Sequence, residues 1–179
     1  MNIFMVHEDP VIAAQSLVDK HCVKMILESA QLLSTAHRML DGTEYIGKTL
    51  TGRNVRRWEL ADLREPVVYQ ATHVNHPSAV WARTSVENYN WLYEHFFALM
   101  TEYTYRYGKT HKCAGDLAYM LACPPYNLKD YDMTKMPSAM AKDYIISENP
   151  VENYRNYYKN GKNHLHKWTK RQPPEWLVA

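Results

Sequence analysis

Apolar residues recur at helical spacing near the start of the chain. Asp9 followed by Pro10 is typical of a helix start, because a carboxylate caps the first amide groups and proline fits the first turn. No further proline or glycine appears before Gly42. The pattern predicts one helix of about eight turns from Pro10 to about Leu40. Its core face would carry Val23, Ile26, Leu27, Ala30 and Leu33.

A second helical pattern begins at Pro77 and ends near Gly108, with Thr84 and Glu87 spaced as a capping box that could mark a restart. Shorter helices are expected over 114–121, 137–146 and 150–159. The insertion 41–76 contains three glycines and several arginines, and it is interpreted as a long loop with a short helix inside. No segment alternates clearly between apolar and polar residues. The prediction is an all-α single domain over 1–179, a compact bundle of two long helices with shorter C-terminal helices.

Composition narrows the class of protein. A chain of 179 residues suits one domain, and 46% hydrophobic with 22% charged residues is typical of a globular fold. Cys22, Cys113 and Cys123 are an odd number at wide spacing, which favours free thiols and a cytoplasmic setting. The start of the chain lacks a leader pattern, and no apolar run approaches the roughly 18 residues of a membrane span, so we expect neither secretion nor a membrane partner.

Charge and aromatic residues indicate nucleic acid as a partner. The net charge of +2 is too small for a protein that coats nucleic acid, but the segment 150–172 concentrates six basic residues against one acidic residue. Such a segment is a candidate phosphate-binding surface. The chain also has 14 Tyr and 5 Trp, whose flat side chains either stack on bases or fill the core. We therefore expect DNA as the partner, while the sequence does not indicate an oligomeric state.

A narrow polar strip runs along the first predicted helix, with His21 at its edge. His21 and Glu28 lie two turns apart, about 10.5 Å along the axis, so they could bracket a substrate without touching each other. The alternative is a solvent-exposed stripe stabilised by pairs such as Lys24 with Glu28. The strip comprises Lys24, Glu28, Gln31, Thr35 and Arg38.

Several of these residues resemble the phage endonuclease V family of pyrimidine-dimer DNA glycosylases and AP lyases. Asp19-Lys20-His21, with Glu28 seven residues later, is similar to the family's D-Q-H and following Glu. The order of later segments is also similar to that of the family. These are the helix end Arg106-Tyr107-Gly108 with His111 after it, the segment Tyr154-Arg155-Asn156-Tyr157-Tyr158, and the pair Gly161-Lys162.

The resemblance implies an all-helical DNA glycosylase, with or without AP-lyase activity, that needs no cofactor and no metal. Its N-terminal α-amine, here that of Met1, would attack C1′ of a damaged nucleotide and form an imine. An α-amine suits this role because more of it is unprotonated at neutral pH than of a lysine. Glu28 would handle the sugar ring or the elimination proton, and His21 would position the sugar-phosphate. The expected DNA contacts are Lys24, Arg38, Arg83, Arg155, Tyr157, Tyr158 and Lys162.

The chain also departs from the family. Asn2 follows Met1, whereas the family exposes a small residue such as Thr after removal of Met. An early arginine is replaced by the apolar Ile3, Phe4 and Met5, and Arg38 supplies charge at a position that matches no family residue. These departures bear on the lyase step and the pyrimidine-dimer substrate more than on the fold. A relative that acts on another nucleotide glycosidic bond fits equally well.

Two other functions stay open at this point. One is a non-catalytic nucleic-acid-binding or inhibitor protein on the same fold. The other is a metal- or cofactor-assisted enzyme acting on a nucleotide or base, with His76, His95 and His111 as the first ligands to inspect, although no complete metal-binding motif is present. The run Trp81-Ala82-Arg83 could form a second pocket wall with Arg83 pointing inward. Alternatively, Trp81 is a core residue and Arg83 a surface charge.

Overall fold

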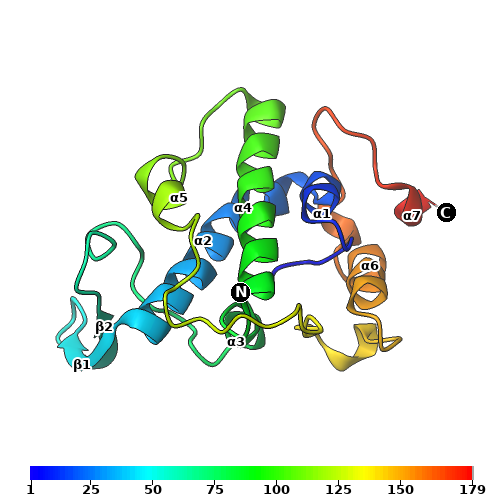
Figure 1. Ribbon diagram of the computed structural model, residues 1–179. Helices are drawn as coiled ribbons and strands as arrows, with labels where there is room; N and C mark the ends of the chain where they lie inside the picture. Colours follow the sequence, from blue (N-terminus) through cyan, green and yellow to red (C-terminus); the bar gives the residue numbers. More distant parts are fainter. Residues whose placement is uncertain (179) are drawn as a thin grey trace.

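A computed structural model describes residues 1–178 (Figure 1). Helix α4 runs through the middle of the molecule, α2 crosses behind it, and α6 and α7 lie at the edge opposite the β-strands. The helices and strands are α1 (Pro10–Ser16), α2 (Asp19–Asp41), β1 (Thr43–Lys48), β2 (Asn54–Glu59), α3 (Pro77–Ala82), α4 (Val86–Tyr107), α5 (Asp116–Met120), the 3₁₀ turn Lys142–Tyr144, α6 (Pro150–Gly161), the 3₁₀ turn Asn163–Leu165 and α7 (Glu175–Val178).

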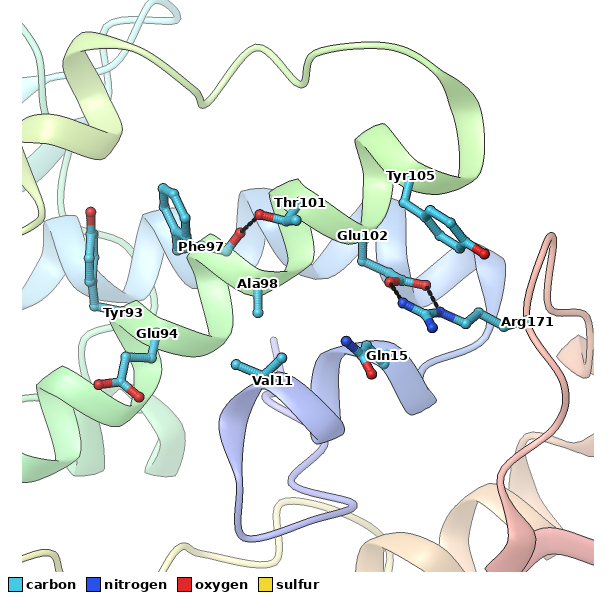
Figure 2. A pocket seen from close by; sticks show the side chains of 10 residues that line it. All are labelled: Val11, Gln15, Tyr93, Glu94, Phe97, Ala98, Thr101, Glu102, Tyr105 and Arg171. Carbon is cyan, nitrogen blue, oxygen red and sulfur yellow. Dashed lines mark hydrogen bonds and ion pairs between the residues drawn. The ribbon is translucent and has the colours of Figure 1, made fainter.

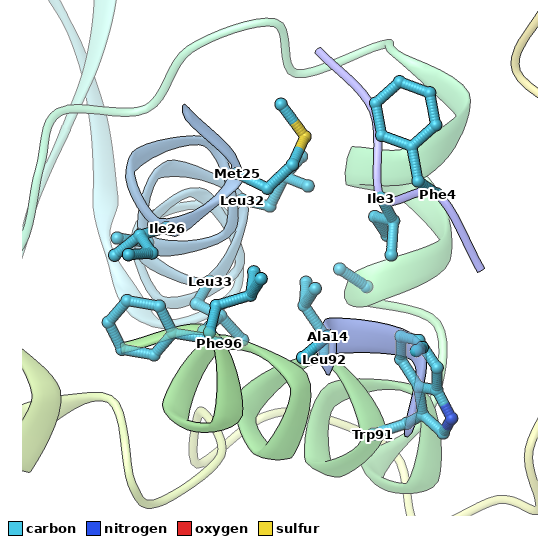
Figure 3. Packing of buried hydrophobic residues seen from close by; sticks show 14 of the residues in the cluster. Ile3, Phe4, Ala14, Met25, Ile26, Leu32, Leu33, Trp91, Leu92 and Phe96 are labelled. Atoms are coloured by element: carbon cyan, nitrogen blue, oxygen red, sulfur yellow. The ribbon is translucent and has the colours of Figure 1, made fainter. Parts of the chain in front are cut away.

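The core forms where α1 and α2 pack against α4. Ile26 and Leu33 of α2 meet Leu92 and Phe96 of α4, and all four side chains are fully buried (Figure 3). Ile3 joins them from the N-terminal segment, which runs through the interior before α1 begins. Burial of this apolar surface is the main stabilising contribution to the fold, and it also draws the start of the chain against α2.

The insertion after α2 corrects the all-α prediction. β1 and β2 pair antiparallel, with Thr43 opposite Glu59 and Lys48 opposite Asn54, so the fold is mixed α/β with a small sheet. No short helix forms in 41–76. The strands escaped the sequence pattern because most of their side chains are exposed and only Trp58 is buried. Without a core-facing side there is no alternation of apolar and polar residues to detect.

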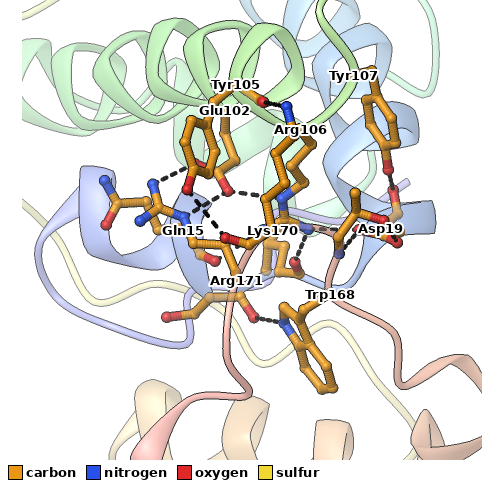
Figure 4. Close-up of polar contacts among 12 residues, drawn as sticks. Gln15, Asp19, Glu102, Tyr105, Arg106, Tyr107, Trp168, Lys170 and Arg171 are labelled. Carbon is orange, nitrogen blue, oxygen red and sulfur yellow. Dashed lines mark hydrogen bonds and ion pairs between the residues drawn. The ribbon is translucent and has the colours of Figure 1, made fainter.

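The first predicted helix is two helices, which is a second correction. Leu17 and Val18 are extended and separate α1 from α2, although neither is a helix breaker. The carbonyl groups left free at the break find distant partners. Arg106 donates to the carbonyls of Gln15 and Leu17, and Trp168 donates to that of Ser16 (Figure 4). Tertiary hydrogen bonds therefore replace helical ones.

Asp19 belongs to the same cluster. Its carboxylate accepts hydrogen bonds from the backbone N–H and the hydroxyl of Thr169, at 2.9 and 2.8 Å, and forms an ion pair with Arg106 at 3.1 Å. These partners lower the pKa of Asp19 against the opposing effect of its burial, so the carboxylate is charged at neutral pH. The residue that opens the family-like motif therefore fixes the start of α2.

Local capping signals are confirmed at several helix ends. Asp9 accepts from the backbone N–H groups of Val11 and Ile12, and Pro10 takes the first helical position. The second pattern breaks as expected, into α3 and α4, but Ser85 rather than Thr84 caps α4. Gly108 ends α4 in the left-handed conformation, which favours glycine. The three cysteines are unpaired.

The expected helix over 137–146 is wrong. That segment contains only one 3₁₀ turn, because its polar groups bond elsewhere. The carbonyl of Ala139 accepts from Asn2, its N–H donates to Tyr154, and the N–H of Ile146 donates to Asn153. The segment thus links the start of the chain to α6.

Candidate functional site

The start of the chain lies against Glu28 of α2. The backbone N–H of Asn2 donates to Oε2 of Glu28 at 2.9 Å, and the α-amine of Met1 is 3.9 Å from the same oxygen. The side chain of Asn2 is held as well, since its Nδ2 donates to the carbonyl of Ala139 and its Oδ1 accepts from the hydroxyl of Tyr154, both at 2.9 Å. Residue 2 is thus anchored on both sides, and the amine is held beside a carboxylate.

Burial differs between the parts of this site. The Met1 side chain is 3% exposed, but the residue as a whole is partly exposed, so its main-chain end reaches the surface. The Glu28 side chain is 12% exposed. Lys24 lies 3.2 Å from Oε1 of Glu28 with its own side chain 68% exposed. The carboxylate is therefore shielded on the protein side by the chain start and on the solvent side by a lysine that can move away.

His76 is a further titratable group near the amine. It caps α3, where its Nδ1 accepts from the backbone N–H of Ser78 at 3.2 Å. Burial lowers the pKa of His76, and the positive N-terminal amine and His73 act in the same direction, while Glu28 opposes them. A pKa below its ordinary value leaves the imidazole neutral at pH 7, so His76 could accept a proton within electrostatic reach of the amine and Glu28.

His21 lies deeper than its predicted role requires. Its ring stacks on Phe4 with 4.2 Å between ring centroids, and its Nδ1 is 2.5 Å from the hydroxyl of Tyr158. Burial, together with the nearby positive charges of Lys162, Lys24 and His164, lowers the pKa of His21 to about 4. The imidazole is therefore neutral at pH 7.

Two of the predicted DNA contacts are buried within the protein. Arg38 makes five hydrogen bonds, one for each N–H of its guanidinium, to carbonyls of four residues and to the Glu65 carboxylate. It holds the insertion against α2. Tyr158 is fully buried and orients His21. We therefore leave Arg38 and Tyr158 out of the candidate DNA surface.

The other predicted contacts lie at or near the surface. The Nζ of Lys162 is 4.8 Å from the ring centre of Tyr157, and Tyr157 in turn packs against Phe4 at 6.2 Å. Arg155 donates from Nε to the carbonyl of Val6, and its guanidinium lies over a tryptophan ring of α7. Arg83 is partly buried at the end of α3, and its Nη1 is buried without a partner among residues 1–178.

The polar strip of α2 is not the exposed stripe of the alternative interpretation. Thr35 and Glu28 are buried, and only Lys24 is open to solvent. The hydroxyl of Thr35 exchanges hydrogen bonds with the backbone of Thr72. Val23, expected on the core face, is exposed. The strip is covered by the chain start and by the end of the insertion.

The histidines named for the metal hypothesis do not meet. In the part of the chain that is described, no three His, Cys, Asp or Glu side chains come together as a metal site would require. His95 is fully buried, and its Nδ1 bonds to the carbonyl of Pro10 at 2.9 Å. His111 packs against Tyr103 near the end of α4.

A groove of about 460 Å³ lies away from these residues, between α1 and the outer side of α4 (Figure 2). Val11 and Phe97 contribute apolar surface to it, and an ion pair between Glu102 and Arg171 closes one end. Both carboxylate oxygens of Glu102 accept hydrogen bonds from arginines, so Glu102 is held in a structural ion-pair network rather than poised for catalysis.

Sequence reasoning missed Asn2, Phe4 and Tyr154 as parts of the site. Phe4 has a positive φ of 57°, unusual for a bulky residue, and this turn places its ring on His21. The apolar run Ile3-Phe4-Met5 counted only as a departure from the family. Its contacts with α6 span most of the chain, so a single sequence carries no signal for them.

Comparisons of the chain with protein-family models, with curated proteins and with solved structures found no match. Within residues 1–178, no helix combines the length and the apolar character that crossing a membrane requires.

Proposed function

We propose that the protein acts on DNA as an N-glycosylase for a damaged or modified base, with the α-amine at the start of the chain as its nucleophile. The observation that supports this most directly is the distance of 3.9 Å between the Met1 amine and Oε2 of Glu28. Removal of Met1 would turn the nitrogen of Asn2, 2.9 Å from the same oxygen, into the α-amine. Either start of the chain keeps an amine beside the carboxylate.

The chemistry assigns a role to each group. Glu28 accepts a proton from the amine, whose lone pair then forms a bond to C1′ of the nucleotide. The bond from C1′ to the base breaks, and the base leaves with its electron pair and takes up a proton. The nitrogen loses its second proton, and its lone pair then forms the C=N bond of the protonated imine as the C1′–O4′ bond breaks and O4′ takes up a proton. Loss of a 2′ proton then permits β-elimination of the 3′ phosphate. Glu28 or His76 would accept this proton.

The surroundings suit a nucleotide. Lys24 and Lys162 bring positive charge close to His21, and both charges lower its pKa. Tyr157 is half-buried between Phe4 and Tyr144 with Lys162 over its ring, so an extruded base would displace Lys162 to stack on it. Neutral His21, fixed by Tyr158, could hydrogen-bond to a sugar or phosphate oxygen.

Borohydride trapping tests this proposal. Intact mass first establishes whether residue 1 or residue 2 carries the free amine. The protein is then incubated with duplexes that contain an abasic site, and the imine is reduced. We expect a covalent adduct that peptide mapping places on the first residue. A reductively methylated N-terminus serves as the control and should give no adduct. An adduct on a lysine, or none from the unmodified protein, would contradict the amine mechanism; retained DNA binding without an adduct would favour the non-catalytic alternative.

A further inference from the structure

The hairpin β1–β2 continues from the end of α2 and reaches the edge of the molecule (Figure 1). Trp58 anchors its base in the protein, and the rest of both strands is largely exposed. At the tip, the N–H of Gly52 donates to the carbonyl of Thr49 at 2.9 Å, and the N–H of Thr49 donates to that of Arg53 at 2.9 Å. Gly52 has a φ of 81°, which closes a tight, defined turn.

The tip presents an apolar side chain between basic ones. Leu50 is fully exposed, at 109% of its reference accessibility, in a turn where polar residues are usual. Lys48, Arg53 and Arg57 form no ion pair within residues 1–178, whereas Arg56 is engaged by Glu44 through two hydrogen bonds of 2.6 and 2.7 Å. The hairpin thus offers three cations whose charge the protein does not neutralise.

The position of the hairpin would let a duplex that contacts it also pass the N-terminus. In Figure 1 the N-terminus lies between the hairpin at one edge and α6 at the other. From Glu28 to the end of α2 is about 20 Å, given the rise per helical residue, which corresponds to about six base pairs of duplex. A duplex that spans α6 and the hairpin would pass the start of the chain.

We infer that this hairpin is a DNA-binding arm that grips the duplex to one side of the reactive nucleotide. Lys48, Arg53 and Arg57 pair with phosphates, and Leu50 enters a groove, where apolar side chains contact sugars and base edges. A two-stranded ribbon has dimensions that a DNA groove admits, and unneutralised positive charge around an apolar tip complements DNA rather than an apolar protein surface. The inference takes its partner, DNA, from the proposed function.

Charge removal at the tip gives the main test. The test variant carries Lys48→Gln and Arg53→Gln together. The control variant carries Lys109→Gln and Lys112→Gln, at two exposed lysines beyond α4. Binding to a duplex with an abasic site is measured by fluorescence anisotropy over a range of salt concentrations. We expect the hairpin variant to bind about tenfold more weakly, with a salt dependence shallower by about two phosphate contacts. The control should stay within about twofold of wild type.

Leu50→Ser tests the apolar contact, with Leu63→Ser as its matched control, since Leu63 is 80% exposed in the loop after β2. We expect about threefold weaker binding for the first and no change for the second. A third variant replaces 48–54 by Asn-Gly, which keeps the pairing of Gly47 with Val55 and closes the shortened strands with a two-residue turn. It should bind at least as weakly as the double variant.

The outcomes separate this inference from the proposed function. If wild type binds and is trapped but the hairpin variants bind equally well, the arm is wrong and the glycosylase proposal stands. If wild type binds without being trapped and the hairpin variants bind more weakly, the arm stands and the amine mechanism fails. Hairpin variants that change only the oligomeric state would assign the hairpin to protein contacts and overturn the inference, and so would the absence of any DNA binding by wild type.

Discussion

Two charged side chains of α2, Arg38 near its C-terminal end and Glu28 near its middle, are both buried, but the protein satisfies them to different degrees. Near the C-terminal end, Arg38 is 1% exposed and each of its five N–H groups has a hydrogen-bond acceptor. Near the middle of the helix, Glu28 accepts one backbone N–H, and its other close partners are the amine at 3.9 Å and the exposed Lys24. Arg38 thus belongs to a closed network, here called the closed end of α2, whereas the surroundings of Glu28 and His21, here called the open end, are less fully satisfied.

This difference separates scaffold from the proposed site. A buried charge whose donors are all engaged can only be disturbed at a cost in stability. A carboxylate that keeps part of its capacity for a chain terminus and a surface lysine can exchange those partners for a substrate. We therefore expect changes at the two ends of α2 to act on different quantities, stability at one and turnover at the other.

The largest expected effect is a loss of stability in acid. It tests the buried, neutral histidines, two of which lie on α2 near Glu28 and Arg38. Burial lowers the pKa of His21, His37 and His95 to about 4. Below the ordinary value of 6.5 the unfolded chain binds protons that the folded protein does not, so stability is complete above pH 6.5 and is lost as the pH falls toward 4. The loss is on the order of 5 kcal/mol at about pH 5 for three such histidines.

Urea denaturation followed by tryptophan fluorescence measures this loss. His37→Gln should reduce the pH dependence, since one imidazole fewer takes up a proton on unfolding, even if the variant is less stable overall. A free energy of unfolding that stays constant between about pH 7 and 5 would contradict the buried, neutral state of these rings.

Arg38→Met should have the next largest effect, again on stability. The change removes the guanidinium from several carbonyls and leaves the Glu65 carboxylate with only the backbone N–H of Leu60, so we expect the free energy of unfolding to fall by about 3–5 kcal/mol. Lys24→Met on the same helix removes an exposed partner of Glu28 and should cost less than about 1 kcal/mol. Equal losses in the two variants, measured by urea denaturation, would break the distinction between a closed and an open end.

Glu28→Gln should affect turnover rather than stability. The amide keeps an acceptor for the N–H of Asn2 but cannot take a proton from the amine. We expect the rate of borohydride trapping to fall by about 100-fold or more, with the melting temperature changed by only a few degrees. Glu65→Gln is the matched control at the closed end, where it should lower stability and leave the trapping rate of the folded fraction unchanged. The reverse pattern would assign Glu28 to the scaffold.

The sequence predicted those parts of the fold that depend on neighbouring residues. Asp9 with Pro10 marked the start of α1, and Gly108 marked the end of α4, because capping is settled within one helical turn. It failed where distant partners decide. Nothing near Leu17 predicts a break, since the groups that stabilise it, Arg106 and Trp168, lie in other segments.

The candidate site followed the same rule. Spacing along one helix brought Glu28 and His21 together as a hypothesis, and the resemblance drew attention to the first residue. Spacing could not show that Asn2 bonds to Glu28 or that Tyr158 orients His21, because these pairs are 26 and 137 residues apart. Spacing also placed Arg38 in the same strip as Glu28. The structural role of Arg38 depends on the insertion, which folds over it and supplies its hydrogen-bond acceptors.

The smallest expected effect concerns Tyr158, which holds His21 at the open end. Tyr158→Phe removes the hydroxyl from Nδ1 of His21 and should cost about 1 kcal/mol of stability. If His21 positions the sugar-phosphate, its loosened ring should also slow trapping by about tenfold. Tyr93→Phe, the control, loses a partly buried hydroxyl that donates to the carbonyl of Ala118 at 3.2 Å, away from His21, and should lower stability slightly without slowing trapping. Equal trapping rates in the two variants would leave His21 as part of the scaffold, with the amine and Glu28 as the whole of the reactive site.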